Sequence, residues 1–185
     1  MSSPLEQLNG EEQRALLEWA RAAIVSAVAG GPLGLPQPEP GCFALQRGVF
    51  VTVHVAGKLR GCIGVIEPRE SLQNTVRHCA ESAALRDGRF APVNALELHD
   101  LVIEISVLSE LAPLEPENVE IGKHGLYVAN QEHHGLLLPQ VAVEHRLSRE
   151  QFLEETCRKA GLPRDAWRRK DMMFYGFTCQ VFREA

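Results

Sequence analysis

At 185 residues the chain is long enough for one domain, or for a domain with a small lobe, with a core that needs no disulfide or metal staples. Hydrophobic residues form 45% of the sequence and charged residues 23%, which excludes an intrinsically disordered chain. The net charge of −5 excludes the basic surface that a nucleic-acid backbone requires, so we expect no nucleic-acid partner.

The five cysteines are odd in number and include no Cys-x-x-Cys pair, which favours free thiols over a disulfide framework. The first residues, Met1-Ser2-Ser3-Pro4, do not form a signal peptide, and no apolar run reaches the length of a membrane span. We therefore expect a cytoplasmic protein without a membrane partner.

The first predicted element is an amphipathic helix over residues 9–29, where Asn9 and Glu12 have the spacing of a capping box. A Pro/Gly-rich connection follows at residues 30–41 and carries three prolines that cannot join a central strand. We interpret it as a surface connection within a single domain that spans residues 1–185.

Alternating apolar residues predict a strand over Val49–Val55, a turn at residues 56–58 and a return strand over Leu59–Ile66. A helix is expected over residues 71–86, with Ser71 as its N-cap and Gly88 as its stop signal. Another alternating strand is predicted over Leu101–Leu108.

Short β elements are expected at residues 119–122 and 125–129 on either side of Lys123-His124, and a turn at residues 131–135. A helix is predicted from about Gln140, and Ser148 with Gln151 forms a second capping box before a helix that Gly161 closes. The last predicted strand spans Met172–Phe182, with one face made by Tyr175, Phe177, Cys179 and Val181. Mixed helices and strands with tight turns predict an α+β fold with a largely antiparallel sheet and flanking helices.

The segment from Leu59 to Gly64 is the candidate functional centre. On a regular strand Arg60 and Cys62 share one face, so the arginine can stabilise a thiolate or hold an anionic group. Gly61 and Gly64 remove Cβ atoms where a ligand or another chain segment can approach the backbone.

Purely structural roles are also possible for these residues. A strand cysteine is commonly a small buried hydrophobe, and the two glycines can serve only a bulge or a tight crossing of strands. His124 lies in a glycine-flanked turn, where it is either an acid/base group or a surface histidine. The adjacent pair His133-His134 lacks metal-ligand spacing, so we expect no metal site.

The Leu-Arg-Gly-Cys-Ile-Gly segment at residues 59–64 resembles the hallmark of the AMMECR-type domain, also called AmmeMemoRadiSam system protein A. Further segments resemble the family in the expected order, namely residues 84–92, 97–109, 121–126, 136–142 and 152–162. Many members carry Gly-Trp after the glutamate that matches Glu144, where this chain has His145-Arg146, so an aromatic contact expected there has no counterpart in this sequence.

The resemblance implies an α+β domain with a larger lobe, a smaller lobe and a cleft between them near the signature. It also implies a pathway or complex with a Memo-type protein and a radical S-adenosylmethionine protein. The sequence contains no ligand set for iron, copper or S-adenosylmethionine, so we expect no cofactor.

Two hypotheses follow from these residues. In the first, the protein is a small-molecule enzyme in which Cys62 is the nucleophile, His124 the acid/base group and Glu144 the partner that orients His124. The substrate-binding candidates are then Arg60, Gly61, Gly64, Arg89 and Glu104. In the second hypothesis the protein is a non-catalytic binding or scaffold partner, with Arg60 as an interface anchor and Cys62 packed in the strand.

Overall fold

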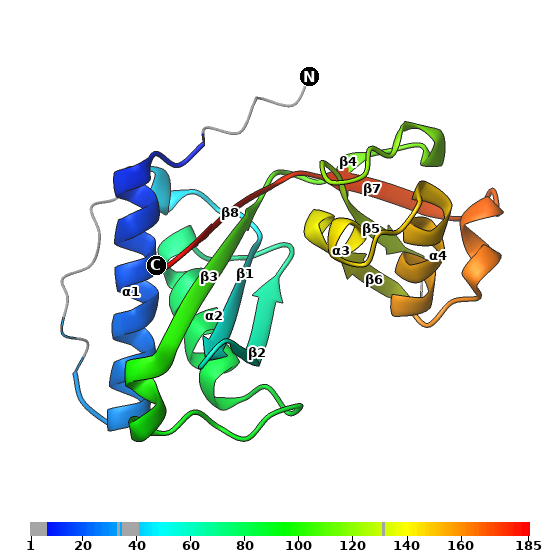
Figure 1. Cartoon of the computed structure of the whole chain (residues 1–185). Helices are drawn as coiled ribbons and strands as arrows, with labels where there is room; N and C mark the ends of the chain where they lie inside the picture. The colour runs from blue at the N-terminus through cyan, green and yellow to red at the C-terminus, as the bar shows by residue number, and fades with distance from the viewer. Residues whose placement is uncertain (1–6, 33, 35–40, 131) are drawn as a thin grey trace. The chain divides into compact units, whose positions relative to one another are not determined.

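The computed structural model describes residues 7–32, 34, 41–130 and 132–185. The chain forms two compact units (Figure 1). The described part of the larger unit comprises residues 7–32, 34, 41–108 and 180–185, and that of the smaller unit comprises residues 109–130 and 132–179. Most of the predicted connection at residues 30–41 lies outside the described residues.

The two long helices of the larger unit begin where the capping signals predicted. Helix α1 (Gly10–Ala29) has Asn9 as its N-cap, and the capping box with Glu12 is formed. Helix α2 (Leu72–Leu85) begins after Ser71, whose side chain accepts a hydrogen bond from the Asn74 N–H. The predicted role of Gly88 is wrong, because α2 ends at Leu85 and the N–H of Arg86 bonds to the Ser82 carbonyl without a left-handed glycine.

The sheet of the larger unit has four strands in the order β2-β1-β3-β8. Strand β1 pairs in antiparallel fashion with both β2 and β3. The strands are β1 (Val49–Val55), β2 (Lys58–Val65), β3 (Leu101–Leu108) and β8 (Cys179–Arg183). Short 3-10 helices complete the unit at η1 (Gly41–Ala44) and η2 (Ala95–Asp100).

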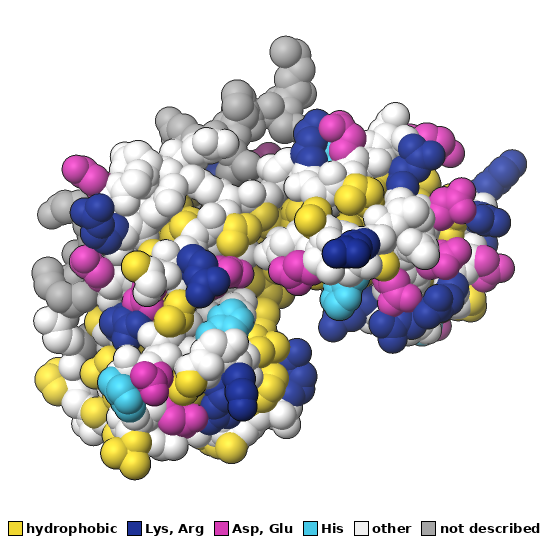
Figure 2. All heavy atoms as spheres, viewed as in Figure 1, with side chains coloured by type: hydrophobic (Ala, Val, Ile, Leu, Met, Phe, Trp, Pro, Cys, Tyr) yellow, Lys and Arg dark blue, Asp and Glu magenta, His cyan; other side chains and the backbone are white. Residues whose placement is uncertain are grey.

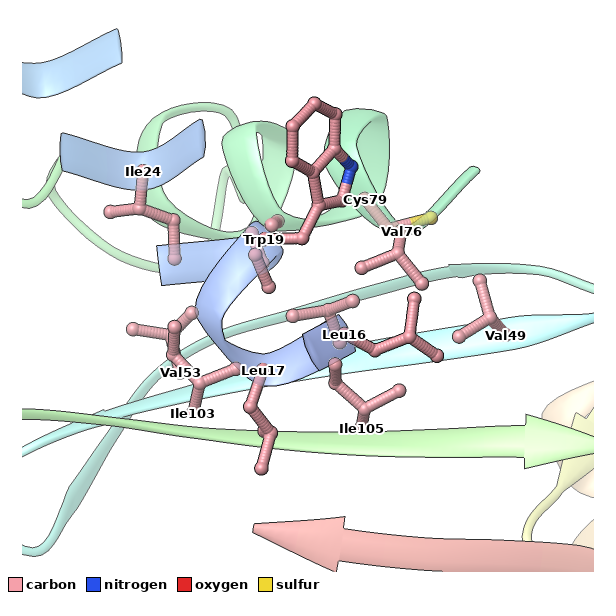
Figure 3. Close-up of a cluster of buried hydrophobic side chains, with 14 of the residues drawn as sticks. Leu16, Leu17, Trp19, Ile24, Val49, Val53, Val76, Cys79, Ile103 and Ile105 are labelled. Atoms are coloured by element: carbon pink, nitrogen blue, oxygen red, sulfur yellow. The ribbon is translucent and has the colours of Figure 1, made fainter. Parts of the chain in front are cut away.

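The core of the larger unit lies between the two helices and one face of this sheet. Alternate residues of β1 and β3 are fully buried and meet the apolar stripe of α1, as Figure 3 shows for Leu16, Ile24, Val53, Ile103 and Ile105. Because alternate side chains of a strand point to opposite faces, the remaining residues of β1 and β3 lie on the face away from the helices.

The smaller unit has its own antiparallel sheet in the order β4-β7-β5-β6. Its strands are β4 (Ala112–Pro113), β5 (Gly125–Ala129), β6 (His134–Leu137) and β7 (Met173–Phe177). Its helices are η3 (Pro116–Asn118), α3 (Pro139–Glu144), α4 (Arg149–Lys159) and η4 (Arg164–Arg168). A second core forms around Phe152, Leu153 and Phe174.

Two sequence predictions in this region are wrong. Residues 119–122 form no strand, because η3 precedes them and a turn occupies 121–123. The single strand expected over Met172–Phe182 is two strands in different sheets, β7 and β8, interrupted at Thr178. At this point Ser109 and Thr178 bond to each other, through the Ser109 N–H to the Thr178 carbonyl and the Thr178 N–H to the Ser109 hydroxyl.

The predicted α+β class with antiparallel pairing is confirmed. The single domain over residues 1–185 and the cleft stay predictions. In the described part of the chain, no helix is long and apolar enough to cross a membrane. On the face shown in Figure 2, basic and acidic side chains are interspersed and do not form a large area of one sign.

Candidate functional site

The two signature glycines have packing roles. A Cβ on Gly61 would collide with the backbone carbonyl group of Ala83 in α2, whose carbon lies 2.7 Å from the Cβ position. A Cβ on Gly64 would overlap the ring of Phe50, its partner across the β1–β2 pair, and would lie 2.6 Å from the Val49 carbonyl oxygen. Both glycines are therefore required for close packing of β2, whether or not a ligand also approaches them.

An ion pair with Glu97 holds the side chain of Arg60. Its guanidinium bonds to the Glu97 carboxylate through Nε and Nη2 at 2.9–3.0 Å, and its Nη1 donates to the Ala91 carbonyl at 2.9 Å. Both side chains are largely buried, and Arg60 also lowers the pKa of Glu97, after a larger effect from the Asn94 N–H. The prediction that Arg60 pairs with the Cys62 thiolate is not supported, because Glu97 and Ala91 engage all three guanidinium nitrogens.

Arg60 also lies at a β-bulge. Val53 pairs with Gly61 while His54 pairs with Leu59, so Arg60 is the extra residue of β2. A bulge interrupts the strict alternation from which Arg60 and Cys62 were expected to share one face. The contacts of Arg60 with Glu97 and Ala91 hold this bulge in place, so we regard Arg60 as a positioning residue for Cys62.

The backbone of Cys62 is bound by an Asp87–Arg89 pair at the free edge of β2. The Cys62 N–H donates to Asp87 Oδ2 at 2.9 Å, and Arg89 Nη2 donates to the Cys62 carbonyl at 3.3 Å. Asp87 is buried, and Arg89 bonds to both of its carboxylate oxygens. The hydrogen bonds from Arg89 hold the pKa of Asp87 far below its usual range, and the same contact raises the pKa of Arg89.

The Cys62 side chain lies on the sheet face away from the helices and is half-exposed. The Thr52 hydroxyl donates a hydrogen bond to its Sγ at 3.3 Å. Thr52 is in register with Cys62 on one side and with Glu104 on the other, so the three residues form a row across β2, β1 and β3. Glu104, a predicted substrate-binding residue, thus lies on the same face as the thiol.

Cys79 provides a contrast within the same unit. It lies on α2 with 2% of its surface exposed. Burial, with a smaller contribution from the charge of a Cys62 thiolate, raises the pKa of the Cys79 thiol to about 12. Between these two thiols, only Cys62 is accessible for chemistry.

His124 belongs to the smaller unit and closes a turn there. Its ring Nδ1 accepts a hydrogen bond from the Glu120 backbone N–H at 3.1 Å, and the backbone N–H of His124 donates to the Glu120 carbonyl at 3.0 Å. Burial and the charge of Lys123 lower the pKa of His124, which favours the neutral ring. Its predicted encounter with Cys62, which is in the larger unit, stays a prediction.

Glu144 is exposed and is the last residue of α3. The helix predicted from about Gln140 forms as α3, but Glu144 lies at its C-terminal end, where the helix dipole disfavours a carboxylate. In the described residues no hydrogen bond or ion pair joins Glu144 to His124, so its orienting role receives no support from the geometry.

The sequence interpretation did not include Thr52, Asp87 or Glu97 among the site residues. Asp87 could have been found, because it lies within residues 84–92, one of the segments that resemble the family. Thr52 could not, because its register with Cys62 depends on the bulge. Among the described residues, no group of three or more His, Cys, Asp or Glu side chains could hold a metal ion.

Comparison with known proteins identifies the family. The sequence pattern of AMMECR1 matches residues 17–182. The chain belongs to the AMMECR1 family. A relative from Methanothermobacter thermautotrophicus is 43% identical over 185 residues, and one from Aquifex aeolicus is 38% identical over 179 residues. These alignments cover 96% of both proteins in the first case and 92% of both in the second.

The AMMECR1 fold is also present in a solved structure. The crystal structure of an uncharacterised protein from Pyrococcus horikoshii matches with a TM-score of 0.88 and 37% identity, over 96% of this chain and 93% of that one. The predicted family and fold are thereby confirmed. Membership in the AMMECR1 family assigns no biochemical activity, so the function must be argued from the site.

Proposed function

We propose that this AMMECR1 protein is a small-molecule enzyme that uses the Cys62 thiol for covalent chemistry, in a pathway with Memo-type and radical S-adenosylmethionine proteins. The observation that carries the proposal is the hydrogen bond from the Thr52 hydroxyl to Cys62 Sγ, on a half-exposed sheet face. A hydroxyl that donates to sulfur stabilises the thiolate form, which is the nucleophilic form of cysteine.

Glu104 is the candidate base of this row. The Cys62 thiolate adds to a carbon of the substrate that is double-bonded to oxygen, so that the C–S bond forms as the C–O π bond breaks. The Glu104 carboxylate accepts the thiol proton and returns it to that oxygen. Directly opposite residues on paired strands have Cβ atoms about 5 Å apart, within reach of a glutamate side chain. His124 remains a second acid/base candidate from the smaller unit.

Site-resolved alkylation of the native protein, read by mass spectrometry, tests the proposal. We expect iodoacetamide at neutral pH to modify Cys62 at least as fast as a free small-molecule thiol, and Thr52→Val to slow this reaction about tenfold. The matched control is Thr75→Val, in the same unit: the Thr75 hydroxyl donates to the Ser71 carbonyl, and its loss should leave Cys62 unaffected. A Cys62 that reacts only after denaturation would exclude thiol catalysis.

The alternative is the non-catalytic docking partner. One observation favours it: Leu59, a large apolar residue of β2 at the start of the signature, is 40% exposed. A large apolar side chain that stays exposed can belong to a docking surface when it is part of a patch. Binding to a purified Memo-type protein, measured by calorimetry and lost in Leu59→Ser, would support docking. Val65→Ser is the control, because Val65 pairs with Val49 and lies on the opposite face of the sheet, and binding that is unchanged in Leu59→Ser would contradict docking.

A further inference from the structure

Arg89 is an exposed cation that bonds to the backbone of Cys62. Its Nε and Nη2 donate to Asp87, and Nη2 also donates to the Cys62 carbonyl. The guanidinium is therefore bound to the backbone of the residue that bears the thiol. The side chain is nevertheless 58% exposed. Among the described residues Nη1 donates no hydrogen bond, so its two N–H donors remain available to a ligand.

Arg60 cannot serve this purpose. Its side chain is 19% exposed, against 58% for Arg89, and its three nitrogens already bond to Glu97 and Ala91. The two arginines of the signature region therefore have different tasks. Arg60 holds the bulge, while Arg89 offers a charged face to solvent.

A positive and a negative side chain lie on opposite sides of Cys62 across the sheet. Arg89 lies outside the free edge of β2, Cys62 follows on β2, Thr52 on β1 and Glu104 on β3. Neighbouring strands lie about 4.8 Å apart, so the Glu104 backbone is about 10 Å from that of Cys62 on the side opposite to Arg89. A molecule that reaches the thiol therefore meets a cation toward the strand edge and a carboxylate toward the sheet interior.

We propose that the substrate of the Cys62 site is an organic oxyanion, a carboxylate or a phosphate ester, held by the exposed edge of Arg89 with its electrophilic carbon over Cys62 Sγ. The inference rests on the proposed function and adds the substrate class to it. The guanidinium binds the oxyanion through the two N–H donors of Nη1, and Glu104 disfavours the reverse orientation because two negative charges would then meet.

Two alkylating reagents that differ only in charge test the inference. Iodoacetate and iodoacetamide form the same C–S bond with loss of iodide, but only iodoacetate carries a carboxylate. At Cys62, the rate with iodoacetate is divided by the rate with iodoacetamide. This ratio, divided by the same ratio for 2-mercaptoethanol, gives a quotient that measures selection for the anion. We expect this quotient to be about tenfold above one at low ionic strength and to fall toward one with added salt.

Variants of similar chemistry serve as controls. Arg89→Gln should abolish the selection and Arg89→Lys should retain part of it. Arg86→Gln removes an exposed arginine three residues away, whose guanidinium donates to the Ser82 hydroxyl, and should leave the quotient unchanged. Because Arg89→Gln also breaks the bonds to Asp87, the fold of this variant is checked by Trp19 fluorescence. The quotient of the wild-type protein tests the inference without any substitution.

The outcomes separate the two proposals. If neither reagent modifies native Cys62, the proposed thiol function fails. If both react with a quotient near one, thiol chemistry survives and the oxyanion inference is overturned. Protection of Cys62 from iodoacetamide by acetate, or instead by inorganic phosphate, would support the inference and identify the preferred oxyanion.

Discussion

Replacing Gly61 by alanine tests the packing of β2 against α2. The added Cβ would overlap the Ala83 carbonyl oxygen and would lie 2.7 Å and 3.3 Å from the Ala83 carbonyl carbon and Cα. These are backbone atoms of a helix, so relief requires that the whole of α2 or β2 shifts. Overpacking commonly costs about 1–3 kcal/mol, and we expect Gly61→Ala to reach about 3 kcal/mol or more because no side chain can rotate away.

The two tryptophans make the effect measurable in the larger unit alone. Trp19 is 2% exposed in the larger core and bonds to the Gln73 carbonyl, while Trp167 lies in η4 of the smaller unit. In a Trp167→Phe background, urea unfolding followed by fluorescence reports on Trp19. In a thermal scan, about 3 kcal/mol corresponds to a fall in Tm of about 6–12 °C for a chain of this size.

Gly88→Ala is the matched control for this substitution. Nothing lies within 4 Å of a Cβ at Gly88, and its φ is not positive. Alanine there should be neutral or should stabilise by less than about 1 kcal/mol. If Gly61→Ala unfolds within about 0.5 kcal/mol of the wild type, the close approach of β2 to α2 is wrong, and the case that the signature glycine serves packing is lost.

Other predictions follow from the same region. Arg60→Gln and Glu97→Gln should each destabilise the larger unit by about 1–2 kcal/mol, and the double substitution should cost less than their sum, as a double-mutant cycle in urea would show; additive costs would contradict the ion pair. Because the folded-state pKa of Asp87 is lowered, its contribution to stability is present above the unfolded pKa of about 3.9 and is lost as the pH falls below it. Asp87→Asn should therefore flatten the acid side of the stability profile, and an unchanged profile would refute the assignment. Since the pKa of Cys79 is raised to about 12, native Cys79 should stay unmodified at pH 8 under conditions that alkylate Cys62; equal labelling would show that the α2 thiol is not buried.

Local signals in the sequence predicted most elements of the fold. The capping boxes at Asn9 and Ser148 mark helix starts because the side chains that satisfy the first N–H groups lie within three residues of them. The strands at residues 49–55 and 101–108 followed from period-two alternation. The same signal failed at Thr178, because an alternating pattern carries no information about which sheet each half of a strand will join.

The candidate site was predicted in part. Cys62 and Arg89 belong to segments that the sequence pattern singled out, and both are half-exposed or exposed on the larger unit. The partner of Arg60 was not predictable, because Glu97 is 37 positions away and approaches only when η2 packs beside β2. Nor could the sequence place His124 and Glu144, whose local surroundings in the smaller unit gave a turn and a helix end.

The sequence by itself determined the hairpin, but the tertiary structure decided which way its thiol points. Ala56 and Gly57 both have positive φ, as a two-residue hairpin turn requires, and Val55 pairs with Lys58. Regular pairing from that turn would set Cys62 opposite Val51, whose side chain is buried toward the helices. The bulge at Arg60, held by contacts distant in the chain, shifts the register by one residue and turns the thiol to the opposite face, because side-chain direction on a strand reverses with every residue.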